Sequence, residues 1–336
     1  MGFEWMFNQV KKRFRQLIIL GKTLWATVPR RLKEGPKRAG WTWKFELLVE
    51  FMRIQLDRAV EIECSRDPTA ARQYLDHTRV SFPGVDRHLT EIEEGPRPLQ
   101  YINPPETKNV DVLYFHGGGY GVYPKTYRYV LTQLSQQIQT PMWIPDYRLA
   151  PEHPFPAALE DARRCYFWLI EHRNINTSNL VVMGDSAGGN LMLSLLISLR
   201  DKEEPMPASG VGISPWTDLL NRGESFQENK PFDYLNKEQA DRMARNYAGQ
   251  KSRTEPLISP VEADLKGLPP LYLQAGESEC LHDMIERFVQ KARESGVEVT
   301  FDTWEEMVHV FTLFHGLQPE VSQAQNRIAD RVNPQE

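Results

Sequence analysis

The chain has 336 residues, of which 40% are hydrophobic and 25% charged, which is the composition of an ordinary globular protein. This length suits one large α/β domain with an accessory element, or two domains. The net charge of −5 argues against nucleic acid as the main partner.

The first 40 residues are basic, although the chain as a whole is acidic. They contain ten Lys/Arg and two acidic residues, Glu4 and Glu34, together with several Trp and Phe. A basic, aromatic segment is typical of peripheral contact with a membrane surface, and it is equally consistent with a solvated helix packed on the body of the protein. Its apolar run, residues 17–20, is too short for a signal peptide or a membrane span.

The three cysteines are Cys64, Cys165 and Cys280. Their number is odd, and their spacing fits neither a zinc site nor a CxxC motif. We therefore expect a reduced compartment, the cytoplasm, and no metal centre.

Helical periodicity dominates residues 3–75, with breaks at 35–36 and 40 and an amphipathic stretch at 46–62. From residue 87 onward, short apolar runs alternate with helical patterns. Strands are expected at 89–93, 99–102, 110–115, 142–145, 180–183, 210–213, 271–274 and 297–303. Helices are expected at 127–138, 157–172, 187–200, 281–295 and 320–332. This alternation predicts an α/β fold, with a mostly parallel eight-stranded sheet flanked by helices.

One stretch, residues 216–260, interrupts the alternation. It contains no convincing strand and one expected helix at 236–248. An insertion that follows a strand end in an α/β sheet lies where ligands bind, so a lid is expected here.

A serine flanked by glycines stands between an expected strand and an expected helix, in the sequence Gly184-Asp185-Ser186-Ala187-Gly188. This G-x-S-x-G pattern in a strand–turn–helix context is the nucleophile elbow. The tight turn needs small neighbours, and the following helix N-terminus favours developing negative charge. Ser186 is the candidate nucleophile, and the alternative is a glycine-rich turn with an incidental serine.

A second glycine motif, HGGG at 116–119, follows the strand expected at 110–115. Glycines allow backbone N–H groups to face a cavity, as an oxyanion hole requires. Gly118, Gly119 and the amide of Ala187 are the candidate donors, unless the glycines form a plain tight turn. We expect His116 to support this loop by hydrogen bonds rather than to act as a base.

Three histidines follow Ser186 and could take its proton. His309 comes just after the last expected strand, on a loop that returns to the carboxyl edge of the sheet. His315 is expected a turn or more inside a helix, and His282 near the start of another. The order of the triad in this type of fold, serine then acid then histidine, favours His309.

The acid that orients the histidine is expected just after the strand at 271–274. Four acids follow that strand: Glu277, Glu279, Asp283 and Glu286. The loop position favours Glu279, with Asp283 second, and the residues alone leave this choice open.

With these motifs the chain resembles the hormone-sensitive-lipase family of α/β-hydrolases over residues 85–320. The likeness rests on HGGG at 116–119, DYRLAPEHPFPAALED at 146–161, GDSAGG at 184–189, ISPWTDL at 213–219 and GLPPLYLQAG at 267–276. It implies an α/β-hydrolase catalytic domain formed by 86–215 and 261–336. It also implies a helical cap formed by the insertion 216–260, to which the N-terminal segment 1–85 contributes.

The resemblance also implies roles for individual residues. It assigns Ser186 as the nucleophile and His309 as the base. It assigns the oxyanion-hole amides to Gly118, Gly119 and Ala187. Glu279 occupies the position where many members have the Asp of a D-P-L-x-D run. Val310 follows the histidine where glycine is frequent.

The expected function is a serine carboxylester hydrolase that acts on short- to medium-chain acyl esters, or on related small esters and lactones, without a metal or organic cofactor. A non-catalytic ligand-binding relative and an amidase or deacetylase with the same residues remain alternatives. The sequence leaves a homodimer open. Four aromatic residues are candidates for either an apolar pocket or the core: Tyr120, Tyr123, Trp216 and Phe226.

Overall fold

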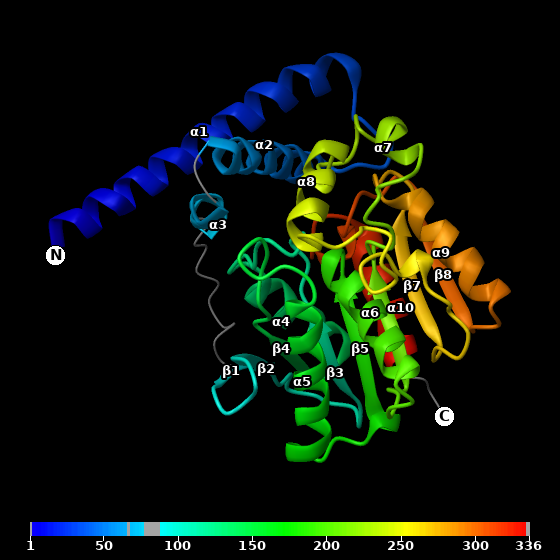
Figure 1. Cartoon of the computed structure of the whole chain (residues 1–336). Coiled ribbons are helices and arrows are strands. Elements are labelled where there is room, and N and C mark those ends of the chain that lie inside the picture. The colour runs from blue at the N-terminus through cyan, green and yellow to red at the C-terminus, as the bar shows by residue number, and fades with distance from the viewer. Residues whose placement is uncertain (1, 66–67, 77–87, 334–336) are drawn as a thin grey trace.

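An eight-stranded sheet forms the centre of the computed structural model, which describes residues 2–65, 68–76 and 88–333 (Figure 1). Its strand order is β1-β2-β4-β3-β5-β6-β7-β8. The strands are β1 Leu89–Ile92, β2 Leu99–Ile102, β3 Asp111–Phe115, β4 Met142–Pro145, β5 Leu180–Asp185, β6 Ser209–Ile213, β7 Leu271–Gly276 and β8 Val299–Trp304. Strand β2 runs antiparallel to β1 and β4, and all other neighbours are parallel. The predicted mostly parallel sheet is confirmed.

The central strands are apolar throughout because both of their faces are covered. In β3, Val112 and Tyr114 join the apolar cluster on one face, whereas Leu113 and Phe115 join the cluster on the other. Alternating side chains of a strand point to opposite faces, so each strand contributes to two cores.

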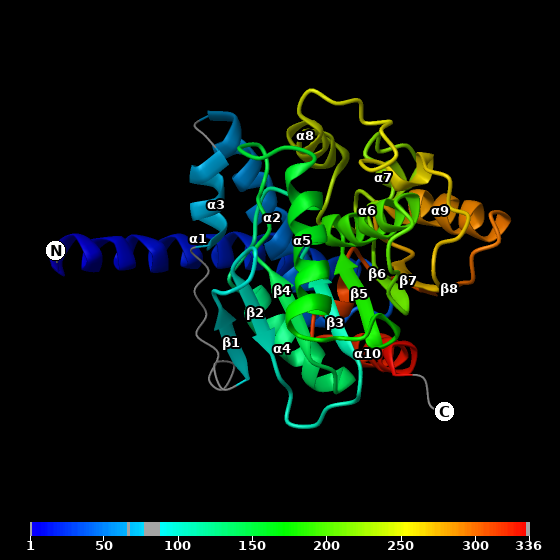
Figure 2. The same ribbon diagram turned by 60° about the horizontal axis from the view of Figure 1, so that its bottom comes forward.

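Helices cover both faces of the sheet (Figures 1 and 2). α4 Tyr127–Ile138 and α10 Pro319–Val332 pack together on one face, and α5 Ala157–His172, α6 Ala187–Asp201 and α9 His282–Glu294 lie on the other. These helices agree with the predicted ones to within two residues. None of the described helices is both long enough and apolar enough to cross a bilayer.

Three helices precede the sheet: α1 Gly2–Glu34, α2 Trp43–Ser65 and α3 Pro68–Asp76. The turn between α1 and α2 is attached to the far end of the chain. The indole of Trp41 donates to the carbonyl of Glu306 at 2.8 Å, and the amide of Thr42 donates to the side chain of Gln318 at 2.9 Å. Arg53 of α2 donates to the carbonyl of Asp233 at 2.7 Å. The N-terminal helices therefore contact both the loop after β8 and the segment that follows β6.

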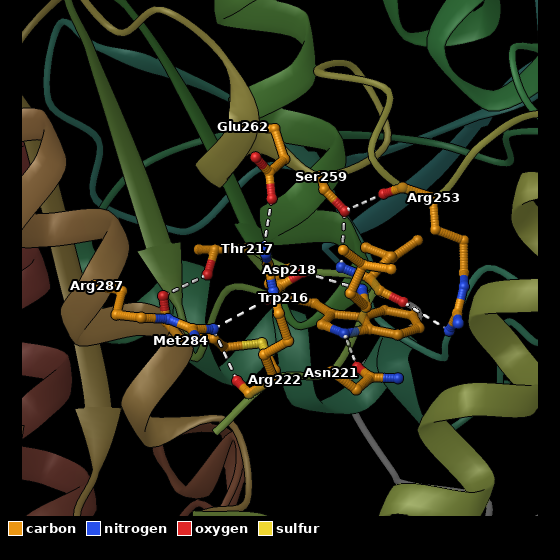
Figure 3. A network of polar contacts seen from close by, with 12 residues as sticks. Trp216, Thr217, Asp218, Asn221, Arg222, Arg253, Ser259, Glu262, Met284 and Arg287 are labelled. Carbon is orange, nitrogen blue, oxygen red and sulfur yellow. Dashed lines mark hydrogen bonds and ion pairs between the residues drawn. The ribbon is translucent and has the colours of Figure 1, made fainter. Parts of the chain in front are cut away.

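The segment that follows β6 contains α7 Ser225–Glu228 and α8 Lys237–Ala248, and no strand is present in its described residues, 216–260. Its base is fixed by a network of charged groups (Figure 3). The buried carboxylate of Asp218 accepts from Arg222 at 2.7 Å and from Arg287 of α9 at 2.9 Å. Arg222 also pairs with Glu262, which lies just after the end of the segment. Both ends of the insertion are therefore held together on α9.

Candidate active site

Ser186 lies at the sharp turn between β5 and α6, with φ 52° and ψ −118°. This is a strained backbone conformation for a residue with a side chain. The small neighbours are necessary, because a Cβ atom on Gly184 would lie 2.3 Å from the carbonyl oxygen of Gly188. A Cβ atom on Gly188 would lie 1.9 Å from the carbonyl oxygen of Phe115. The turn presents the hydroxyl of Ser186 at the carboxyl end of β5.

His309 reaches Ser186 from the loop after β8. Its Nε2 atom lies 2.9 Å from the Oγ atom of Ser186. Val310, which follows it, adopts the left-handed conformation at φ 53°. The Tyr234 hydroxyl donates to the His309 carbonyl at 2.9 Å. His309 is 4% exposed, so little water competes for its ring nitrogens.

The other two histidines contact different groups. His282 contacts the carbonyl of Gly276 at 3.1 Å, and His315 contacts Gln325 at 3.3 Å. The expectation that His315 lies inside a helix is wrong. It lies between the 3₁₀ turn Phe311–Leu313 and α10. The left-handed backbone of Gly316, at φ 73°, interrupts the helical path between these two elements.

Glu279 is fully buried beside the imidazole. Its Oε1 atom lies 3.6 Å from Nδ1 of His309, a distance suited to attraction between charges but longer than a hydrogen bond. Its Oε2 atom accepts from the amide of Gly276 at 2.9 Å. The competing acid, Asp283, instead accepts from the amide of Ser225 at 2.8 Å. Of the two candidates, the structure brings Glu279 to the histidine.

Ser214, at the end of β6, connects the acid to the histidine loop. Its hydroxyl donates to Oε2 of Glu279 at 2.6 Å and accepts from the amide of Val310 at 3.0 Å. We did not single out Ser214 from the sequence. It lies in the ISPWTDL block at the end of an expected strand. A polar residue at that position was the only indication of a role that the sequence offered.

Asp233 is a second residue that the sequence analysis missed. It is 1% exposed, and its carboxylate accepts from the amides of Cys280 at 2.7 Å and of His309 at 3.4 Å. Burial raises the pKa of Asp233 to about 6, while the nearby His309 opposes that rise. An acid flanked by Phe232 and Tyr234 was the available sign of burial.

Opposing effects act on the pKa of His309. Burial lowers it, whereas the negative charges of Glu279, Asp233 and Asp185 raise it, and the net result is a pKa above the ordinary value of 6.5. The surrounding carboxylates therefore stabilise the charged imidazolium.

The glycine loop lies beside Ser186. Gly118 has φ 107°, and a Cβ atom there would lie 2.2 Å from the carbonyl oxygen of Val122. The amides of Gly118 and Gly119 donate to no acceptor among the described residues, and both glycines line the cavity described below. The preceding amide, of Gly117, donates to buried Asp185 at 2.9 Å. Asp185 therefore ties this loop to the serine turn.

His116 lies within a stack of tyrosines. Its ring is sandwiched between Tyr123, with centroids 3.8 Å apart, and Tyr147, with centroids 4.2 Å apart. Its Nδ1 atom lies 2.7 Å from the carbonyl of Gly117. Burial lowers the pKa of His116 to about 3, so this ring is neutral at physiological pH. The ring contacts its own loop and does not reach Ser186.

A cavity of about 700 Å³ leads to Ser186 and His309. Its wall is mainly apolar, with contributions from α2 and from the insertion that include Phe51, Met52, Tyr234, Leu235 and Met243. Of the four aromatic candidates, Trp216 lines the cavity, whereas Tyr120 and Phe226 are buried in the core. Tyr123 stacks on His116 instead.

Comparison with known proteins finds relatives among the hydrolases. Residues 112–313 match a family described by its alpha/beta hydrolase fold. An acetyl-hydrolase of Streptomyces hygroscopicus is 38% identical over 224 residues, which are 66% of this chain and 74% of that protein. An esterase of Acinetobacter venetianus is 29% identical over 299 residues, 87% of this chain and 96% of that protein.

Solved structures give the same result. The esterase EstE5 superimposes with a TM-score of 0.77 and 34% identity, over 85% of this chain and 97% of that one. An esterase of the bacterial hormone-sensitive lipase family superimposes with a TM-score of 0.74 and 36% identity, over 83% of this chain and 97% of that one. The chain therefore belongs to the α/β-hydrolase fold family, among the carboxylesterases of the hormone-sensitive-lipase type.

Proposed function

We propose that this carboxylesterase hydrolyses short- to medium-chain acyl esters with Ser186 as nucleophile, His309 as base and Glu279 as the orienting acid. The observation that carries the proposal is the 2.9 Å contact between Oγ of Ser186 and Nε2 of His309. A serine is a weak nucleophile until a neighbouring base removes its proton, and this contact supplies the base.

In the acylation step, Nε2 of His309 takes the hydroxyl proton while Oγ of Ser186 attacks the ester carbonyl carbon. The imidazolium then gives its proton to the departing alcohol, which leaves an acyl-serine. Glu279 stabilises the imidazolium, and its 3.6 Å separation from Nδ1 shortens as the ring becomes charged.

The negative charge on the carbonyl oxygen is stabilised by the amides of Gly118, Gly119 and Ala187. Removal of one such donor raises the barrier by about 3 kcal/mol in other enzymes. Water then attacks the acyl-serine, His309 takes a proton from the water, and the acid leaves as Ser186 regains its hydrogen. His116 supports the glycine loop, since its ring is held between two tyrosines.

The substrate assignment rests on the cavity and on the relatives. An apolar cavity of about 700 Å³ accommodates a small acyl group together with an alcohol. One relative is named an acetyl-hydrolase, and EstE5 was soaked with p-nitrophenyl butyrate. Residues 216–260 and the N-terminal helices line this cavity, which supports their assignment as a cap. A cytoplasmic location remains a prediction from the sequence.

The test is hydrolysis of p-nitrophenyl esters from acetate to palmitate by the wild type and Ser186→Ala, with p-nitroacetanilide as the amide comparison. We expect kcat/KM to peak at short or medium chains and to fall to background in the variant. Activity retained by folded Ser186→Ala would contradict the assignment of Ser186 as the nucleophile. Faster cleavage of the anilide would favour the amidase alternative. Binding without turnover by the wild type would favour a receptor-like role.

A further inference from the structure

Helix α1 carries an apolar face that the rest of the chain leaves uncovered. Of the seven large hydrophobic side chains that are exposed within the described residues, six lie on α1: Leu17, Ile18, Leu20, Leu24, Trp25 and Leu32. Trp25 is 83% exposed and Leu32 is 75% exposed. Soluble proteins seldom expose such a contiguous apolar patch without a binding role for it.

These residues form one face of the helix. At 100° per residue, Leu17, Ile18, Leu24, Trp25 and Leu32 fall within about 120° of one another, on the side opposite the buried residues Ile19, Thr23 and Thr27. Leu20 lies at the edge of this face, beside Thr27. Helix α1 packs on α2 through its buried side, so the centre of the apolar face points away from the body. The N-terminal half of α1 extends beyond the rest of the molecule in both views (Figures 1 and 2).

The apolar face borders the entrance to the catalytic cavity. Leu20 is exposed and also lines that cavity, next to Leu48, Phe51 and Met52 of α2. The cavity therefore reaches the surface beside α1. An apolar molecule held against α1 could therefore reach Ser186 through the apolar cavity.

The charge of α1 indicates what covers it. The helix contains eight Lys/Arg and two Glu, whereas the remainder of the chain has an excess of acids. Lys22 and Lys33 lie at one edge of the apolar face and pair with no acid among the described residues. A second copy packed α1 against α1 would bring two basic helices together. An anionic lipid surface instead complements both the charge and the apolar face.

We propose that α1 docks on an anionic lipid surface, with Trp25 and its apolar neighbours inserted below the headgroups, so that esters dissolved in the lipid enter the cavity beside Leu20. The docking step is supported by the surface properties of α1 alone and does not depend on the proposed function. The delivery of substrate also rests on the proposed ester hydrolysis.

The docking test is flotation of full-length Ser186→Ala with vesicles of phosphatidylcholine, with and without 30% phosphatidylglycerol. We expect binding to the anionic vesicles that declines with added salt. Adding Trp25→Glu should weaken this binding at least tenfold. The control, Ala26→Glu, makes the same charge change one residue away on an exposed position outside the apolar face, and it should weaken binding much less.

The delivery test uses the active enzyme with and without Trp25→Glu. The substitution should leave hydrolysis of water-soluble p-nitrophenyl acetate unchanged, and it should slow hydrolysis of a medium-chain ester embedded in anionic vesicles. If the active enzyme without the substitution hydrolysed neither ester, the proposed function would be contradicted and the flotation result would stand.

Three results would overturn the docking proposal. They are no flotation with anionic vesicles, equal flotation of the Trp25→Glu and Ala26→Glu variants, and a dimer in analytical ultracentrifugation that Trp25→Glu converts to a monomer. The last result would assign the apolar face to a second copy of the chain.

Discussion

The hydroxyl of Ser214 donates a 2.6 Å hydrogen bond to Glu279, and the same oxygen accepts from the backbone amide of Val310. One side chain at the end of β6 therefore fixes both the candidate acid and the residue next to His309. The two loops that carry these residues come from different strands, β7 and β8. Their relative position depends on this buried hydroxyl as well as on the sheet.

Ser214→Ala should lower the free energy of unfolding by about 2 kcal/mol, because it leaves a buried carboxylate oxygen and a buried amide without one partner each. Ser278→Ala is the matched control. Ser278 is equally buried, but its hydroxyl has no hydrogen-bond partner in the described chain. Its removal should change stability little. Denaturant unfolding measures the stability of both variants. Equal losses of stability would show that the hydrogen bonds of Ser214 contribute nothing beyond ordinary packing.

Glu279→Gln should reduce kcat by about 10³-fold or more, because a neutral amide cannot stabilise the imidazolium. Asp283→Asn should reduce kcat much less, since Asp283 lies in the same loop region but accepts from Ser225. Steady-state kinetics on one p-nitrophenyl ester compares the two variants. A larger loss of kcat in Asp283→Asn would assign the orienting acid to Asp283 instead.

Gly118→Ala should reduce kcat by about 10²-fold or more, since its Cβ would overlap the backbone of Val122 and displace the oxyanion amides. Gly121→Ala should be nearly neutral, because a Cβ atom there meets nothing closer than 3.9 Å. Both glycines lie on the same loop. Comparable rate losses in the two variants would argue against a special role for the Gly118 amide.

Asp233→Asn should shift the acid limb of the kcat/KM profile to lower pH, by about half a pH unit or more. His309 must be neutral to act as a base, so activity falls as the pH drops through its raised pKa. The charge of Asp233 contributes to that rise, and removing it lowers the pKa of His309.

Asp241→Asn is the control, because this acid of α8 pairs with Arg253 and not with His309. Its pH profile should match the wild type. A loss of rate in Asp233→Asn with an unchanged profile would mean that Asp233 acts as a structural group and does not tune the histidine.

The strands could be predicted because their apolar runs are bounded by glycine and proline, and because the core continues on both faces of the sheet. The break in the pattern at 216–260 likewise corresponds to the segment without strands. The local sequence pattern gave a wrong prediction at His315, which was expected inside a helix. The apolar residues 310–314 suggest a helix, whereas the left-handed Gly316 separates a short 3₁₀ turn from α10.

The residues of the candidate site differ in how readily they could be predicted from the sequence. Ser186 and the HGGG loop stand in local motifs whose chemistry depends on neighbours in sequence. Ser214 and Asp233 act through contacts with residues more than 45 positions away, such as Glu279 and Cys280. Such contacts leave no local pattern, so the fold was needed to reveal them.

The most direct test of the central claim is covalent labelling with phenylmethylsulfonyl fluoride, followed by peptide mass spectrometry. An activated serine displaces fluoride and retains the sulfonyl group. We expect one adduct per chain, on Ser186, that forms in step with the loss of esterase activity and is absent from Ser186→Ala. An adduct on a different serine that tracks inactivation, or full esterase activity in the Ser186→Ala protein, would contradict the account.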